Sequence, residues 1–184
     1  MESRVAIVRS ELLVLRHRSG DAAALPELVE LWERPLLYYL RRLLESEPDA
    51  WDALQETWLR VVRDLPRLRD ERAFPSWLYT IARNAAFSAR RRTRPTEPLP
   101  EEESDRELPA GAPEPSLDGW DAMDIHAALA RLSLAHRDAL TLHFLEGFSI
   151  AEIGAITGAA QGTIKSRLYH AKRAMRLLLE GGQS

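Results

Sequence analysis

The chain of 184 residues contains no cysteine. This absence excludes disulfides and metal sites built on thiolates, and it favours an intracellular setting. No apolar run approaches the roughly 20 residues of a membrane-spanning helix, and the N-terminal residues lack the basic-then-apolar layout of a secretory signal. We therefore expect a cytoplasmic protein that does not insert into membranes.

The sequence also lacks the residue patterns of common catalytic and cofactor sites. Its five histidines are scattered without the spacing of metal ligands, and no glycine-rich phosphate-binding loop is present. Asp52 and Glu56 lie one helical turn apart, but on an exposed face without the pocket that acid–base catalysis requires. The sequence therefore predicts no enzyme, no metal site and no cofactor.

The formal net charge is −3, which is unusual for a protein that binds DNA unaided. The charge is unevenly spread, because residues 90–94 contain four arginines and no acid, whereas residues 95–118 contain eight acids, one arginine and six prolines. Proline removes backbone donors and like charges repel, so we expect residues 94–118 to form an acidic, flexible linker. The alternative is an ordered loop between two domains.

Helical periodicity occurs on both sides of this linker, and no stretch shows the alternation of a half-buried strand. In a first domain, residues 1–93, we expect helices at 4–17, 22–44, 49–64 and 73–92. Pro35 should kink or interrupt the second of them. In a second domain, residues 119–184, we expect helices at 120–132, 134–146, 150–157 and 161–180. The predicted fold class is all-α, with two small helical domains.

A helix-turn-helix pattern lies near the C-terminus. Ser149 and Glu152 form the pattern of a capping box before a short apolar helix, which Gly158 should end. The longer helix that follows carries one narrow apolar face, made of Ile164, Leu168, Ala171 and Met175. Its other face is basic and polar, and no acid occurs from 161 to 176. This combination is typical of a DNA-binding helix-turn-helix.

The helix expected at 49–64 has a face that is suited to a protein partner. Its core stripe should consist of Leu54, Trp58, Val61 and Leu65. The opposite face presents an apolar side chain among charged and polar ones, namely Asp52, Gln55, Glu56 and Leu59. An apolar anchor with a polar rim is typical of a small docking surface. A merely solvated face is the alternative.

Three segments of the chain resemble motifs of bacterial sigma factors, the subunits that give RNA polymerase its promoter specificity. Residues 52–60 (DALQETWLR) resemble region 2.2, which binds the polymerase core, and residues 72–84 (RAFPSWLYTIARN) resemble regions 2.3 and 2.4. Residues 142–175, which include EGFS and GTIKSRL, resemble region 4. The two-domain layout is similar to that of extracytoplasmic-function (ECF, group IV) sigma factors, and the resemblance covers residues 20–179.

The resemblance implies two DNA-binding surfaces. Region 2 binds the −10 element as a melted strand, which needs stacking surfaces and a basic track, and the loop at 66–72 lies where the family captures a flipped base. The implied −10 contacts are Arg69, Arg72, Tyr79, Arg83, Asn84, Phe87 and Arg90. Region 4 places its last helix in the major groove of the −35 element, and the implied contacts are Gln161, Thr163, Lys165, Ser166, Arg167, Tyr169 and Arg173.

Three alternatives remain open for these DNA contacts. Phe87 could pack against the first or second helix, the loop at 66–72 could be simply solvated, and the last helix could follow only the DNA backbone.

The implied function is promoter-specific transcription initiation. The implied partners are the bacterial RNA polymerase core (its β and β′ subunits) and promoter DNA. Sigma factors of this kind are often held by an anti-sigma factor, and regulation by synthesis or by the N-terminal extension is the alternative. The protein would associate with the nucleoid when bound to polymerase. A stand-alone helix-turn-helix regulator is the alternative, although neither a dimerising heptad nor the net charge favours it. Residues 1–18 lie outside the resemblance, and they could pack on the second helix or bind something else.

Overall fold

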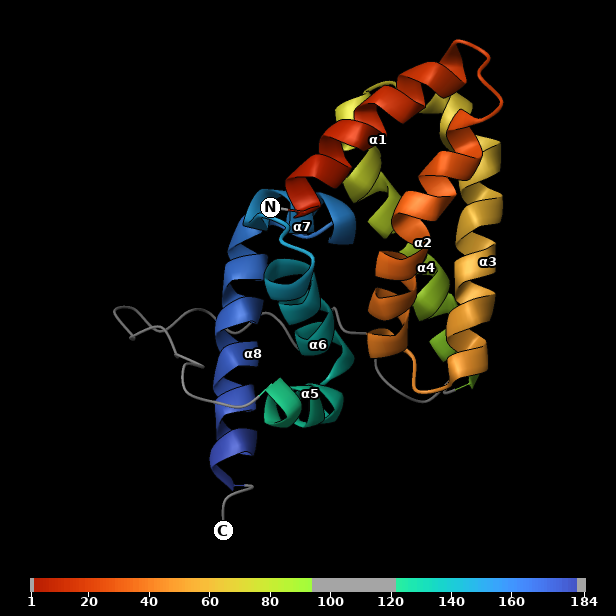
Figure 1. Ribbon diagram of the computed structural model, residues 1–184. Helices are drawn as coiled ribbons and strands as arrows, with labels where there is room; N and C mark the ends of the chain where they lie inside the picture. Colours follow the sequence, from red (N-terminus) through yellow and green to blue (C-terminus); the bar gives the residue numbers. More distant parts are fainter. Residues whose placement is uncertain (1, 94–121, 182–184) are drawn as a thin grey trace. The chain divides into compact units, whose positions relative to one another are not determined.

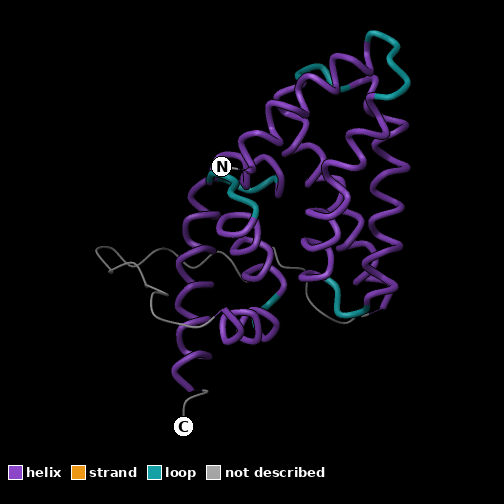
Figure 2. The backbone as a smooth tube through the Cα atoms, in the orientation of Figure 1, coloured by secondary structure: helices purple, strands orange, loops and turns teal. Residues whose placement is uncertain are grey.

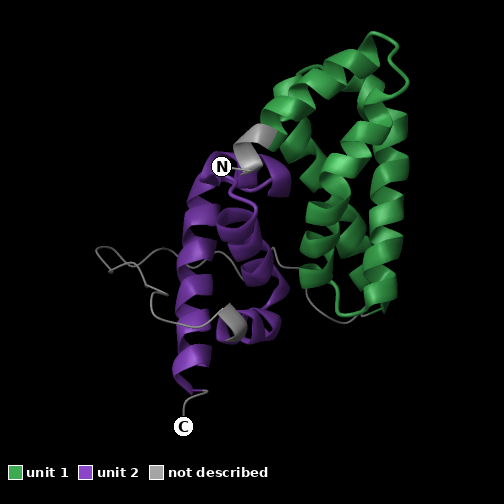
Figure 3. Cartoon of the chain, viewed as in Figure 1, with its two compact units in different colours: residues 1–96 green, residues 97–184 purple. Residues whose placement is uncertain are grey.

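The computed structural model describes residues 2–93 and 122–181, and within these ranges every regular element is a helix (Figures 1 and 2). The chain divides into two compact units, residues 1–96 and 97–184 (Figure 3). The predicted all-α class with two helical domains is confirmed. The linker expected at 94–118 lies outside the described residues.

The described part of unit 1, residues 2–93, contains four α-helices and two short 3₁₀ turns. The helices are α1 (Glu2–Arg18), α2 (Ala24–Leu43), α3 (Glu47–Asp64) and α4 (Phe74–Thr93), and the turns η1 (Leu65–Arg67) and η2 (Glu71–Ala73) connect α3 to α4. α2 and α4 each pack against the three other helices of this unit. α2 continues through Pro35 without the interruption that the sequence suggested. The neighbouring Leu36 and Leu40 are fully buried, and their packing opposes the cost of the lost hydrogen bond.

α1 is an integral part of unit 1. Leu13 and Val14 are buried, and the indole N–H of Trp32 on α2 donates to the hydroxyl of Ser10 at 2.7 Å. That hydroxyl donates in turn to the carbonyl of Ala6 at 2.7 Å, so the buried polar groups satisfy one another. Of the two alternatives for residues 1–18, packing on the second helix is therefore the one observed.

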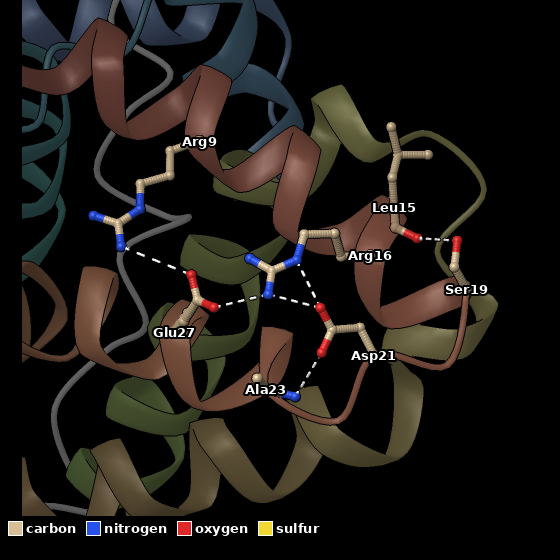
Figure 4. Close-up of polar contacts among 7 residues, drawn as sticks. All are labelled: Arg9, Leu15, Arg16, Ser19, Asp21, Ala23 and Glu27. Atoms are coloured by element: carbon tan, nitrogen blue, oxygen red, sulfur yellow. Dashed lines mark hydrogen bonds and ion pairs between the residues drawn. The ribbon is translucent and has the colours of Figure 1, made fainter.

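A polar network fixes the turn between α1 and α2 (Figure 4). The guanidinium of Arg16 donates to Asp21 at 2.7 Å and to Glu27 at 2.9 Å, and Arg9 lies 3.9 Å from Glu27. The other oxygen of Asp21 accepts from the backbone N–H of Ala23 at 2.9 Å. The Ala23 N–H and the Arg16 guanidinium both lower the pKa of Asp21, because they stabilise its ionised form.

This lowered pKa predicts a pH-dependent contribution to stability. Because the folded pKa of Asp21 lies below its ordinary value of 3.8, the contribution is fully present above that value and is lost as the pH falls through the folded pKa. We expect Asp21→Asn to lower the urea midpoint near neutral pH, and we expect the deficit to shrink towards about pH 3. Urea titrations of both proteins across this range test the prediction, and a deficit that does not change with pH would contradict it.

Unit 2 contains the second group of helices. They are α5 (Ala122–Arg131), α6 (Leu134–Leu140), α7 (Ile150–Thr157) and α8 (Gln161–Gly181), and a π-helical turn, η3 (Thr141–Leu145), follows α6. The single helix expected at 134–146 therefore changes type at Thr141, whose carbonyl accepts from the N–H of Glu146, five residues on, at 3.0 Å. α8 packs against α5, α6 and α7, and its side chains Ile164 and Met175 are buried as expected.

The helix-turn-helix forms as the sequence predicts. The hydroxyl of Ser149 accepts from the N–H of Glu152, and the Glu152 carboxylate accepts from the N–H of Ser149 at 2.8 Å, which completes the capping box. Gly158 ends α7 in the left-handed conformation, with φ +74°. The turn is tight, since a Cβ added at Gly154 would lie 3.0 Å from the carbonyl oxygen of Ala159.

We expect Gly158→Ala to destabilise unit 2 by about 1 kcal/mol, because a side chain strains the left-handed conformation. Gly162→Ala is a matched control on α8, where an added Cβ has no neighbour within 4 Å and φ is ordinary. The control should be neutral or should stabilise by up to about 1 kcal/mol through its helix propensity. Urea unfolding of the full chain measures both changes, and equal effects of the two substitutions would contradict this account of the turn.

Candidate protein-binding and nucleic-acid-binding surfaces

The four residues expected to bind a protein lie on the side of α3 that faces away from its buried stripe. Leu59 is 73% exposed, and Asp52 and Gln55 are exposed beside it. Glu56 is half-buried and accepts a hydrogen bond from Arg60 at 2.6 Å. An apolar side chain this exposed, with carboxylates around it, has the composition of a docking anchor and its rim.

Two further apolar residues extend this surface, and the sequence analysis missed them. Trp51 is 40% exposed and Val62 is 51% exposed, on the same side of α3 as Leu59. We call Trp51, Leu59 and Val62 the α3 ridge. The spacing 51, 55, 59 and 62 is a helical one and could have revealed the ridge in the sequence. The ridge and its polar rim form a contiguous surface on a single helix.

The structure corrects the expected −10 surface at Tyr79, Arg83 and Phe87. Tyr79 is fully buried, with its ring centroid 5.1 Å from that of Tyr39 and 6.1 Å from that of Trp32. Arg83 and Phe87 are each 7% exposed, and the guanidinium lies 4.1 Å from the centre of the phenyl ring. The expected open face was wrong because α1, α2 and α3 all pack against α4, and these three side chains lie among its buried residues.

A different stripe of α4 remains accessible. It consists of the exposed Asn84 and Arg91 and the half-buried Trp77, Thr80 and Ser88. Of these, only Asn84 was among the expected −10 contacts. The guanidinium of Arg91 donates to the Ser88 hydroxyl at 3.1 Å. The expected contact Arg90 is half-buried, and its guanidinium lies 3.6 Å from the carboxylate of Glu45. This face offers an amide, hydroxyls and cations to a ligand.

The segment 65–73, which we call the α3–α4 loop, has a basic surface. Arg69 and Arg72 are exposed as expected, and the side chain of Arg67 is 84% exposed. The backbone N–H of Arg72 donates to the carboxylate of Asp70 at 3.0 Å, so this acid is occupied within the loop. The loop thus presents arginine side chains on a backbone that is held by short turns.

The seven residues expected at the −35 element divide into accessible and buried groups. Gln161, Lys165 and Arg173 are exposed, and Thr163 and Tyr169 are half-buried. Ser166 and Arg167 are only 6% and 4% exposed, so the expectation of an open face was wrong for both. Arg167 adjoins the buried Leu168 on the edge of the apolar stripe.

Two further features of the described residues bear on other functions. Among the described residues, no group of three or more His, Cys, Asp or Glu side chains is arranged to hold a metal ion. Within the same residues, no helix combines the length and apolar character needed to cross a membrane.

Comparisons with known proteins match both units. The family model for Sigma-70 region 2 matches residues 28–96, and that for Sigma-70, region 4 matches residues 122–175. The ECF RNA polymerase sigma factor SigL of Mycobacterium tuberculosis is 33% identical over 164 residues, which are 88% of this chain and 92% of SigL. RNA polymerase sigma factor CarQ of Myxococcus xanthus is also 33% identical, over 89% of this chain and 94% of CarQ.

A solved structure is similar as well. The sigma factor RpoE of Bartonella quintana, determined in complex with the anti-sigma factor NepR, superposes with a TM-score of 0.65 and 28% identity. The match covers 84% of this chain and 96% of RpoE. Both sigma regions, their order and the fold agree with the resemblance in the sequence, and they overturn the alternative of a stand-alone regulator. The chain therefore belongs to the ECF sigma factors of the sigma-70 family, non-enzymatic initiation factors that bind core RNA polymerase and direct it to promoters.

Proposed function

We propose that this sigma factor docks on core polymerase through the α3 ridge and its rim of Asp52, Gln55 and Glu56. The observation that carries the proposal is the 73% exposure of Leu59, which lies within the segment, residues 52–60, that resembles region 2.2. Burial of a side chain this exposed removes apolar surface from water, while the carboxylates around it set the orientation of the partner. The β and β′ subunits are the proposed partners.

The −10 strand is assigned to the α3–α4 loop and the accessible stripe of α4. Arg69 and Arg72 would bind phosphates or a flipped base, and Asn84 and Arg90 would continue the track along α4. Trp77, a half-buried residue on this stripe, would add a stacking surface. The buried Tyr79, Arg83 and Phe87 are not part of this assignment.

The −35 duplex is assigned to α8 of unit 2. Lys165 and Tyr169 lie in the first half of the helix, where a recognition helix reads base edges, and Arg173 lies one turn beyond Tyr169. Gln161 and Thr163 lie at the helix start, where backbone N–H groups favour phosphate. The domain boundaries proposed are 1–93, 94–118 and 119–184, with the acidic linker passing through the polymerase.

Regulation by an anti-sigma factor is part of the proposal. The support comes from RpoE of Bartonella quintana, which was determined with the anti-sigma factor NepR bound. The proposed site of action is the cytoplasm, at the nucleoid when the protein is bound to polymerase.

Photo-crosslinking of promoter DNA to the assembled holoenzyme tests the two DNA assignments. A photoreactive base in the non-template strand of the −10 element should crosslink to unit 1, and one in the −35 element should crosslink to unit 2. Proteolytic mapping of the labelled chain identifies the unit. Crosslinks in the reverse order, or crosslinks at −10 to unit 2 alone, would contradict the assignments.

A further inference from the structure

An ion pair joins α1 to the α3–α4 loop. The guanidinium of Arg18, the last residue of α1, donates to the carboxylate of Glu71 at 3.1 Å, across 53 positions of sequence. Arg18 is an exposed residue and Glu71 is half-buried, and their side chains are 30% and 28% exposed. α1 also packs against η2, the turn that contains Glu71 and Arg72. The conformation of the loop is therefore restrained by α1 as well as by its own 3₁₀ turns.

The position of Arg18 is well determined by the rest of α1. Two turns of the helix are fixed to α2 by the Ser10–Trp32 hydrogen bond and by the network of Arg16 with Asp21 and Glu27 (Figure 4). An ion pair costs conformational entropy when it forms, because it orders both partners. When one partner is a residue of a helix that is already fixed, less side-chain and backbone entropy is lost than for a pair between two mobile loops, so the pair restrains the other partner more strongly.

The pair also changes what the loop offers to a ligand. The loop contains two acids, and both have protein partners, since Asp70 accepts from the backbone N–H of Arg72 and Glu71 accepts from Arg18. The three arginines of the loop outnumber its two acids, and Glu71 is paired with Arg18, so positive charge prevails on the loop surface. Without Arg18, the Glu71 carboxylate would be released next to Arg69 and Arg72.

We propose that Arg18 is a positioning residue for promoter opening. Through Glu71 it holds the α3–α4 loop in the conformation that presents Arg69 and Arg72 to the −10 strand. The inference rests on the proposed role of this loop in strand binding. It gives a function to α1, which lies outside the matched family region at 28–96.

The test uses holoenzyme assembled from the full chain and core polymerase, on a forked promoter fragment with a fluorescent adenine analogue in the single-stranded −10 element. We expect Arg18→Ala and Glu71→Ala each to weaken strand binding by about two- to fivefold, the range of a well-formed surface ion pair. The sign of the second effect is decisive. If the charge of Glu71 alone mattered, its removal would tighten binding to a phosphate backbone, whereas lost positioning weakens it.

A double-mutant cycle separates positioning from independent effects. The double variant should lose no more than either single variant, and Arg18→Lys should retain most of the binding. Arg41→Ala is the matched control, because Arg41 pairs with Glu47 between α2 and α3, roughly 27 Å from the loop along the 18 residues of α3. Arg41→Ala should leave strand binding unchanged. The affinities for core polymerase and for the −35 element should be unchanged in all of these variants.

Several results would overturn the inference. They are tighter or unchanged strand binding by Glu71→Ala, additive losses in the double variant, or equal losses in Arg41→Ala. Arg69→Ala and Arg72→Ala distinguish this failure from failure of the proposed function. If these two variants lose strand binding while the Arg18 and Glu71 variants do not, only the positioning role fails. If none of the four has an effect, the assignment of the loop fails.

Discussion

Leu59→Asp is expected to weaken binding to core RNA polymerase by about 30-fold or more, the effect of losing a central interface anchor. Leu59 is the most exposed residue of the α3 ridge, at 73%, and the ridge supplies the apolar surface that a partner can bury. A carboxylate at this position would be desolvated against the partner and would lie near Asp52 and Glu56. Fluorescence anisotropy of the labelled chain, titrated with purified core polymerase, measures the change.

Leu12→Asp on α1 is the matched control for this prediction. Leu12 is 57% exposed, belongs to the same unit and lies outside the ridge. Both substitutions replace an exposed leucine on a helix, so neither should unfold the chain, and circular dichroism with urea titration verifies this. Unchanged core affinity in Leu59→Asp, or an equal loss in Leu12→Asp, would remove the ridge as the docking site.

Lys165→Ala is expected to weaken binding to the −35 element by about 1–3 kcal/mol, with a smaller loss on a scrambled duplex. Lys165 is exposed in the first half of α8. Because no acid occurs from 161 to 176, all the charged side chains in this part of the helix are basic. Competition binding of the holoenzyme to −35 and scrambled fragments measures the selectivity.

Arg173→Ala provides the contrast for a phosphate contact. This substitution should lower the affinity by a similar factor for the −35 fragment and for the scrambled fragment. The magnitude of the slope of log affinity against log salt concentration should fall by about 1. If Lys165→Ala also reduced binding equally on both fragments, α8 would follow only the DNA backbone, which is one of the alternatives that the sequence leaves open.

The sequence predicted the helices well because each follows from local rules. Ser149 and Glu152 cap α7 within one turn, and Gly158 ends it, so no distant contact is needed to place the helix. The π-helical turn at Thr141 was missed, because bonding to the fifth residue leaves no pattern that differs from an α-helix in one sequence.

The candidate sites were predicted less completely, since a helical wheel gives periodicity but not the number of neighbours. For α3, one buried stripe faces the other helices and Leu59 is exposed as expected. For α4, three helices pack around it, and Tyr79, which the wheel placed on an open side, is in the core. The pairing of Arg18 with Glu71 joins residues 53 positions apart and has no periodic signal at all.

Run-off transcription with purified bacterial core polymerase on a library of promoter fragments tests the central claim most directly. The account predicts that the full chain enables initiation from a subset of fragments that share −10 and −35 motifs, and that Leu59→Asp abolishes this activity while Leu12→Asp retains it. Core polymerase that initiates equally with and without the chain, or initiation without sequence selectivity, would contradict the account.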